Sequence, residues 1–186
     1  IAKMISRLTS LILLIIIFPI FVIISIAIIF NDGLPVFFRQ KRIGLNNKVF
    51  WIYKFRTMRN DTPNIATHLI SSKNNYNTRF GKNLRKLSID ELPQLINILK
   101  GDMRFIGPRP ALYNQYDLID LRTKSGIHKI LPGITGWAQI NGRDELSISE
   151  KIELDEYYLM NRSILLNVKI VILTISQIFI PKGVSH

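Results

Sequence analysis

The feature that most constrains this chain is an uninterrupted apolar run near its N-terminus, LILLIIIFPIFVIISIAIIF at residues 11–30. Its 20 residues include one polar side chain, that of Ser25. A helix of about 20 apolar residues matches the hydrocarbon core of a bilayer. The run is longer than the apolar core of a secretory signal peptide, and no small-residue cleavage site follows it. We therefore predict a membrane-embedded segment over residues 1–34.

Pro19 divides this run near its middle. A proline inside a helix removes one backbone hydrogen bond and bends the helix. The two arms, residues 11–18 and 20–30, would measure roughly 12 and 16 Å, about half of a 30 Å core each. Basic residues flank the run on both sides, so charge favours neither direction of crossing: Lys3, Arg7, Arg39, Lys41 and Arg42. Both observations fit a re-entrant helix broken at Pro19, and a single kinked spanning helix stays equally open on the residues alone.

The rest of the chain predicts an α+β fold that is mainly helical, with one compact catalytic domain over residues 35–186. Alternating β-branched and aromatic residues around the turn LNN predict a small β-hairpin at about 36–58. Residues 59–79 are polar and predict a long loop near a site. An apolar helical pattern runs through residues 92–99 and ends at Gly101.

The second half of the chain predicts further helices on the domain surface. The segments IGPRP and LPGITGWAQINGR are expected to be loops, because prolines and glycines break regular structure. Polar helical stretches are expected between them and at about 145–160. The last apolar stretch, residues 163–182, contains Lys169, which would cost about 2.5–3.5 kcal/mol at a bilayer centre. We therefore expect an amphipathic helix on the membrane surface or packed on the domain.

The amino-acid composition limits the classes of molecule that this chain is expected to bind. Lys and Arg number 25 against 13 Asp and Glu, a net charge of +12, which indicates a polyanionic partner such as nucleic acid, anionic lipid or a phosphorylated substrate. The absence of cysteine excludes disulfides and thiol catalysis, and the three histidines lack zinc-site spacing. The aromatic and basic stretch FWIYKFR is explained by a half-buried strand, so we expect no nucleic acid partner.

Two adjacent carboxylates, Asp90 and Glu91 in LSIDELPQL, stand out in this basic chain. A capping box formed by Ser88 and Glu91 would place Pro93 beyond the first helical turn, where it removes a needed hydrogen bond. Pro93 fits if the helix begins between Asp90 and Leu92, which leaves Asp90 as an ordinary N-cap. The same position would favour ionised acids, and an ionised Asp can attack phosphorus or bind Mg²⁺. Both interpretations stay open on the residues alone.

Arginines in rigid contexts surround this pair in the sequence. Arg85 precedes it, Arg109 lies between two prolines in GPRP, and Arg143 follows a glycine in NGR. The guanidinium fork suits phosphate oxygens. The residues therefore predict an anionic phosphate site with a carboxylate pair. A non-catalytic basic module that docks on anionic lipid is the competing class of function.

Three motifs behind the proline-split apolar segment resemble one family: YKFRTM at 53–58, LRKLSIDELPQLINILKGDMRFIGPRP at 84–110 and LPGITGWAQINGR at 131–143. They resemble those of the bacterial sugar transferases, the monotopic polyprenyl-phosphate phosphoglycosyl transferases. The short chain is most similar to the minimal members that initiate N-linked glycan assembly from UDP-N,N′-diacetylbacillosamine. That family's membrane helix breaks at a Ser-Pro pair, whereas this chain has Phe18-Pro19.

The resemblance implies a reaction and a set of roles. The family transfers a phospho-sugar from a UDP-sugar to undecaprenyl phosphate, with release of UMP, through a covalent enzyme intermediate and with Mg²⁺. Asp90 matches the nucleophile and Glu91 its partner, and both are candidate Mg²⁺ ligands. The positions that match phosphate or nucleotide contacts are Lys54, Arg85, Arg109 and Arg143. The implied location is the cytoplasmic face of the bacterial inner membrane, at the first membrane step of glycoconjugate assembly, including protein glycosylation.

Overall fold

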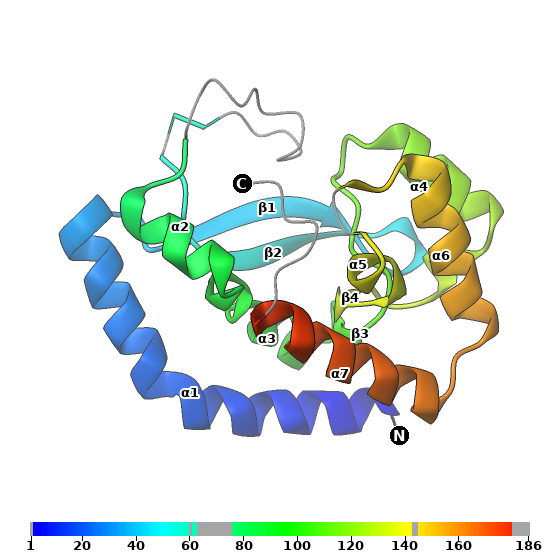
Figure 1. Ribbon diagram of the computed structural model, residues 1–186, viewed down its shortest axis with the longest axis horizontal. Helices are drawn as coiled ribbons and strands as arrows, with labels where there is room; N and C mark the ends of the chain where they lie inside the picture. Colours follow the sequence, from blue (N-terminus) through cyan, green and yellow to red (C-terminus); the bar gives the residue numbers. More distant parts are fainter. Residues whose placement is uncertain (1, 60, 63–75, 143–144, 180–186) are drawn as a thin grey trace. The chain divides into compact units, whose positions relative to one another are not determined.

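The structure, a computed structural model, describes residues 2–59, 61–62, 76–142 and 145–179. It is mainly helical, with short strands (Figure 1), so the predicted α+β class is confirmed. The α-helices are α1 (Ala2–Asp32), α2 (Arg79–Lys86), α3 (Gln94–Lys100), α4 (Tyr116–Lys124), α5 (Trp137–Ile140), α6 (Ile148–Met160) and α7 (Ile164–Phe179). The strands are β1 (Phe37–Ile43), β2 (Val49–Phe55), β3 (Arg104–Ile106) and β4 (Gly133–Thr135). Short 3₁₀ turns are η1 (Leu45–Asn47), η3 (Ile89–Glu91) and η4 (Ile127–Lys129).

The chain divides into two compact units. The first unit comprises Ile1–Gln40 and Ile52–Lys100, and the second comprises Lys41–Trp51 and Gly101–His186. The β-hairpin contributes residues to both units, because its strands cross the boundary at residues 40 and 52. The predicted division into a membrane segment at 1–34 and a catalytic domain at 35–186 stays a prediction.

Helix α1 is one continuous helix with Pro19 inside it, and it bends part-way along its length (Figure 1). Among the described residues it is the one helix long and apolar enough to cross a membrane, by length and composition alone. On both sides of Pro19, α1 contacts the rest of the first unit. The Ser10 hydroxyl donates to the Leu95 carbonyl at 2.6 Å, and Ile24 and Ile28 lie in the core further along. The re-entrant arrangement stays a prediction.

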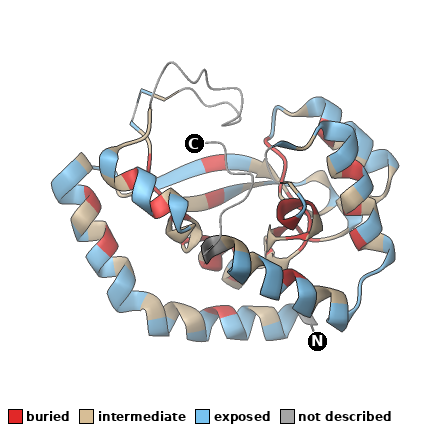
Figure 2. Ribbon diagram, in the orientation of Figure 1, coloured by how far each residue is buried: buried red, intermediate tan, exposed pale blue. Residues whose placement is uncertain are grey.

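The outer surface of α1 is apolar and exposed (Figure 2). Its most exposed large side chains in the apolar run include Ile15, Ile16, Phe18, Ile23 and Phe30. The polar Ser25 side chain donates to the Phe21 carbonyl at 2.6 Å, so its hydroxyl is satisfied within the helix. An apolar surface of this kind, with its polar groups bonded internally, suits lipid rather than water.

The core of the first unit joins α1 to the strand and helices that carry the candidate site. Ile24 and Ile28 of α1 pack with Phe55 of β2 and Leu84 of α2. The rings of Phe21 and Phe37 lie 5.0 and 5.4 Å from that of Phe55. Burying an aromatic ring among aliphatic side chains contributes about 1.5–3 kcal/mol. Phe55 therefore anchors β2 on α1.

The predicted hairpin is confirmed as β1 and β2, which pair in a two-stranded sheet. The turn between them is η1, where Asn46 and Asn47 adopt left-handed φ values of 51° and 59°. Asparagine tolerates this conformation better than most residues, because its short polar side chain bonds locally. The turn predicted at LNN is therefore confirmed.

The second unit corrects the prediction that LPGITGWAQINGR is entirely a loop. Residues 133–135 form β4, which pairs in parallel with β3 in the register Arg104↔Gly133 and Ile106↔Thr135, and α5 follows at residues 137–140. A Cβ on Gly133 would lie 2.1 Å from the Gly107 nitrogen. Gly133 therefore allows the backbones of two segments to approach closely. A glycine-rich segment can serve this purpose in a strand as well as form a turn.

The helical predictions for the second unit agree better with the structure. The stretch at 145–160 contains α6, and the final apolar stretch contains α7. Helix α7 leaves Ile164 and Leu165 each 82% exposed, as expected for an amphipathic surface helix. In the predicted loop at 59–79, residues 60 and 63–75 lie outside the described part of the chain.

Candidate active site

The two carboxylates lie in a tight turn between α2 and α3. Ser88 follows the end of α2 and adopts a left-handed backbone conformation, with φ 54°. Its amide donates to the Arg85 carbonyl at 3.0 Å. Asp90 and Glu91 then occupy η3. The Ser88 side chain makes no capping hydrogen bond, so the capping box does not form.

The expected helix start between Asp90 and Leu92 is instead this 3₁₀ turn, and α3 begins at Gln94. Pro93 is buried between the two, where it needs no amide hydrogen. Asp90 lies inside the turn, and its residue is 7% exposed. A simple N-cap role for Asp90 is therefore wrong, because an N-cap flanks its helix from outside.

Lys54 lies against both carboxylates. Its Nζ donates to Glu91 Oε1 at 2.6 Å and lies 4.0 Å from Asp90 Oδ2. The exposed fractions of the side chains of Lys54, Asp90 and Glu91 are 17%, 9% and 17%. Largely buried charges need a partner of opposite sign, and the ammonium provides it here. Three of the sequence-predicted residues are thus brought together.

A buried amide holds β2 against α3 and thereby sets the position of Lys54. Asn97, which is fully buried in α3, accepts from the Tyr53 amide at 3.1 Å through Oδ1. Lys100 Nζ also donates to the Tyr53 hydroxyl at 2.8 Å. The sequence reasoning missed Asn97. The available signal was a lone asparagine in the apolar segment LINIL, because a polar group on a buried helix face requires a partner.

A second missed network joins the end of α1 to α2. The Arg56 Nη2 donates to the carbonyls of Asp32 and Gly33, at 2.5 and 2.6 Å. The Thr78 hydroxyl donates to Asp32 Oδ2 at 2.9 Å and accepts from the Gly81 amide at the start of α2. Because α2 leads directly to the carboxylate turn, this network connects the end of α1 to the candidate site.

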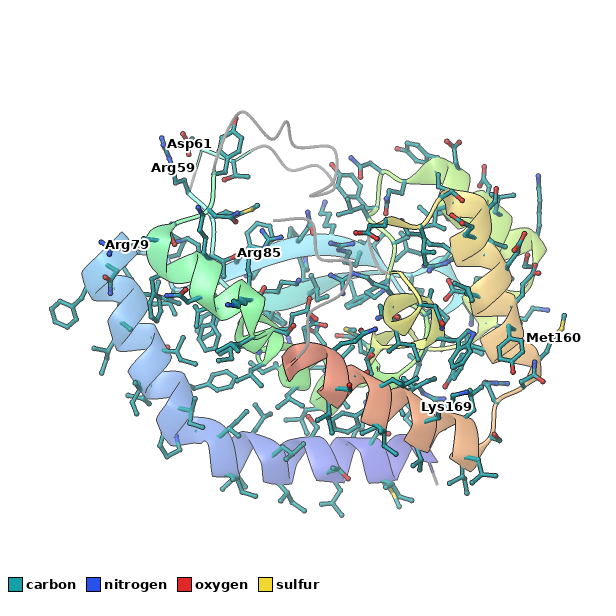
Figure 3. All side chains as sticks on the ribbon, in the orientation of Figure 1. Arg59, Asp61, Arg79, Arg85, Met160 and Lys169 are labelled. Carbon is teal, nitrogen blue, oxygen red and sulfur yellow. The ribbon has the colours of Figure 1, made fainter. Side chains whose placement is uncertain are left out.

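The three predicted arginines lie in different parts of the chain. Arg85 lies in the last turn of α2, where it donates to Asn77 Oδ1 at 3.1 Å, at the end of the helix opposite Arg79 (Figure 3). Arg109 follows β3 in the second unit. Arg143 lies outside the described residues. Within the first unit, the site therefore consists of the carboxylate pair and Lys54, with Arg85 on the helix that precedes them.

Comparison with known proteins decides the family. The family model of the bacterial sugar transferases matches residues 1–181. The chain belongs to the bacterial sugar transferase family. It is 43% identical over 189 residues to a protein of Bacillus subtilis (strain 168) named as the uncharacterized sugar transferase EpsL, an alignment that covers all of this chain and 91% of that protein.

Other members of the family carry more specific names. The chain is 39% identical over 184 residues to an undecaprenyl-phosphate glucose phosphotransferase of Komagataeibacter xylinus, covering 90% of this chain. It is 42% identical over 154 residues to a UDP-N-acetylgalactosamine-undecaprenyl-phosphate N-acetylgalactosaminephosphotransferase of Aeromonas hydrophila, covering 80% of this chain. These alignments span 34% and 36% of the relatives' lengths. By family, the chain is a membrane-associated enzyme of the phosphoglycosyl transferase type.

Proposed function

We propose that this protein transfers a phospho-sugar from a UDP-sugar to undecaprenyl phosphate and releases UMP. The observation that carries the proposal is the pair of buried Asp90 and half-buried Glu91, with Lys54 Nζ 2.6 Å from Glu91 Oε1. The relatives support the class of donor and acceptor, since their names pair UDP-sugars with undecaprenyl phosphate. A basic chain with net charge +12 suits substrates that are all anionic.

In the proposed reaction Asp90 is the nucleophile. Its carboxylate oxygen attacks the phosphorus that carries the sugar, and the bond to the bridging oxygen breaks, so that UMP leaves with the electron pair. A phosphate oxygen of undecaprenyl phosphate then attacks the same phosphorus and displaces Asp90. Lys54 bonds Glu91 more closely than Asp90, which supports the assignment of attack to Asp90. Arg85, Arg109 and Arg143 are proposed to hold phosphate oxygens during both steps.

Mg²⁺ fits the residues present. It binds hard oxygen ligands, and at phosphate-handling sites it uses one or two carboxylates together with substrate oxygens and water. Asp90 and Glu91 offer two adjacent carboxylates, while no group of three or more His, Asp or Glu side chains occurs elsewhere in the described ranges. We propose these two residues as its ligands. When bound, Mg²⁺ would offset the charge of the diphosphate.

The proposed location is the cytoplasmic face of the bacterial inner membrane, with α1 as a re-entrant helix. Support comes from its two arms, which both contact the first unit through Ser10 and Ile28. A straight spanning helix would carry one arm away from that unit. The exposed apolar residues of α7, such as Ile164 and Leu165, are proposed to lie at the membrane surface.

The direct test is UMP release from purified protein in detergent micelles with undecaprenyl phosphate and a panel of donors. The panel contains UDP-N,N′-diacetylbacillosamine, UDP-glucose and UDP-N-acetylgalactosamine. One donor should support release of UMP, and Asp90→Asn should abolish it because the amide is not an anionic nucleophile. The matched control is Asp117→Asn on exposed α4, which should retain activity. Substantial turnover by Asp90→Asn would exclude Asp90 as the nucleophile.

A further inference from the structure

The segment Gly107–Leu112 has an unusual pattern of burial. Five of its six residues are buried, and Arg109 alone is half-buried. Ala111 and Leu112 are 3% and 2% exposed. The backbone of this segment, called here the Arg109 loop, is therefore enclosed on the inside of the second unit, and Arg109 is its only residue with substantial access to solvent.

Four consecutive carbonyl groups of the Arg109 loop each accept a hydrogen bond from a different donor. The prolines at 108 and 110 lack an amide hydrogen, so a regular ladder cannot satisfy this segment by itself. Two donors are backbone amides and two are guanidinium groups. The bonds are Gly133 N to Pro108 O at 3.0 Å, Arg122 Nη1 to Arg109 O at 2.7 Å, Arg42 Nη1 to Pro110 O at 3.0 Å, and Ile43 N to Ala111 O at 2.9 Å.

The donor at Arg109 is itself fixed by a buried carboxylate. Asp155 Oδ2 of α6 accepts from Arg122 Nε at 3.1 Å and from Nη2 at 2.5 Å. The exposed fractions of these side chains are 11% for Arg122 and 1% for Asp155. All three nitrogens of the Arg122 guanidinium group therefore donate hydrogen bonds, two to Asp155 and one to the Arg109 carbonyl. Only a planar fork can make all of these bonds at once.

Stability alone is a poor explanation for this buried pair. Burial raises the pKa of Asp155 against the opposing effect of Arg122, which indicates that the charges are costly to enclose. A direct ligand role is also a poor explanation, because the cavity beside Arg122, Pro108 and Pro110 has a volume of about 30 Å³. That volume holds a water molecule but not a nucleotide or sugar.

We propose that Arg122 and Asp155 are positioning residues for Arg109, holding its carbonyl inward so that its guanidinium is presented to a nucleoside diphosphate. This inference rests on the proposed function, which assigns a phosphate contact to Arg109. Neither positioning residue touches the substrate. A side chain on a fixed backbone loses less conformational freedom when it binds phosphate, so the expected effect of losing this support is weaker binding.

The test replaces both charges together, with Arg122→Met and Asp155→Leu in one protein. Apolar residues of similar size in place of a buried ion pair often leave stability unchanged, because no charge is left unpaired. The net charge also stays +12, so long-range attraction of an anion is unaltered. The readouts are the thermal midpoint, the Kd of UDP by calorimetry, and KM and kcat for UMP release.

We expect an unchanged thermal midpoint, with Kd for UDP and KM for the donor each raised about tenfold, as for a lost phosphate contact. In an Arg109→Ala background the double replacement should add no further loss, because its effect passes through Arg109. A stable double variant with unchanged Kd and KM would overturn the inference. So would losses that add to those of Arg109→Ala.

A second variant and a binding measurement that does not depend on turnover make the experiment conclusive. If the double variant fails to fold, Arg122→Lys retains the buried charge but lacks the fork, and it should raise Kd for UDP in the same way. If the wild-type protein releases no UMP with any donor, the proposed function fails, while the UDP-binding comparison still decides the positioning role. Wild-type protein that does not bind UDP would overturn both.

Discussion

At the residue scale, the candidate site is a small cluster of opposite charges with little access to water. Asp90 and Glu91 were predicted from their sequence context, and Lys54 only from a family motif, because 36 residues separate it from Asp90. The fold brings Lys54 Nζ to 2.6 Å from Glu91. Charged groups this close and this buried depend on each other, which makes Lys54 the most informative residue to change after Asp90.

Replacement of Lys54 by methionine should lower kcat for UMP release by about 10²–10³, the usual effect of removing one electrostatic contact from a catalytic site. Lys54 is a residue of β2, and methionine keeps an apolar stem of similar length, so the packing around this strand should change little. Lys54→Arg should restore part of the activity. Lys124→Met on exposed α4 serves as the control for loss of one positive charge. Wild-type kcat in Lys54→Met would show that the ammonium has no role in the reaction.

The buried polar contacts within each unit could not be predicted by inspection, because each one joins residues that are far apart in the sequence. Asn97 bonds Tyr53 from 44 residues away, and Arg122 bonds Asp155 from 33 residues away. In the sequence each resembles an ordinary polar residue on a helix. A polar residue is recognised as structural only when its partner is known.

At the element scale, residue types identified the long elements and failed for the short ones. The hairpin is rich in β-branched and aromatic residues, and the segments that form α6 and α7 contain no proline or glycine. Strands β3 and β4 have three residues each, too few to show any period. The glycines of β4 indicated a turn, whereas in the fold Gly133 allows the strand to approach Gly107. The boundary of α3 was misplaced because a 3₁₀ turn around Asp90 precedes it.

Helix α6 carries Asp155 and begins with a capping box that gives a prediction for pH. The Ser147 amide donates to Glu150 Oε2 at 2.7 Å, and the Glu150 amide donates to the Ser147 hydroxyl. The bonds from Ser147 lower the pKa of Glu150 below its ordinary value of 4.5. A lowered pKa in the folded state means that ionised Glu150 stabilises the fold above pH 4.5, and that this contribution is lost as the pH falls through the lowered value.

Glu150→Gln should therefore be less stable than the wild type near neutral pH, and the difference should shrink as the pH falls below 4.5. Thermal unfolding of both proteins in detergent micelles over a pH series measures this difference. Ser147→Ala, which removes the cap, should cost about 1 kcal/mol. A difference between Glu150→Gln and wild type that is the same at every pH would contradict the assignment.

At the scale of the whole molecule, the long apolar helix α1 and the candidate site belong to the same unit. Arg56 and Thr78 join the end of α1 to α2, and Phe55 packs against Ile24 and Ile28. The proposed donor is soluble and the proposed acceptor is a lipid, so a site joined to a helix that lies in the bilayer would meet both. If α1 is re-entrant, as proposed, both of its ends lie on the same side of the membrane as the candidate site.

The chain has no native cysteine, so single cysteines report that topology directly. With Ala2→Cys and Leu34→Cys in separate proteins, an impermeant maleimide should label both from the cytoplasmic side of inverted membrane vesicles. Neither should label from the outside of intact spheroplasts. Asp117→Cys on exposed α4 provides the reference for the catalytic side. Labelling of Ala2→Cys and Leu34→Cys from opposite sides would establish a spanning helix.

The proposed mechanism requires that Asp90 form a covalent bond to the transferred phospho-sugar. Mass spectrometry of the protein after incubation with its UDP-sugar donor and no undecaprenyl phosphate detects that bond. We expect release of about one UMP per active site and a phospho-sugar adduct on the peptide that contains Asp90, absent in Asp90→Asn. No UMP without the acceptor, or an adduct on Glu91 instead, would contradict it.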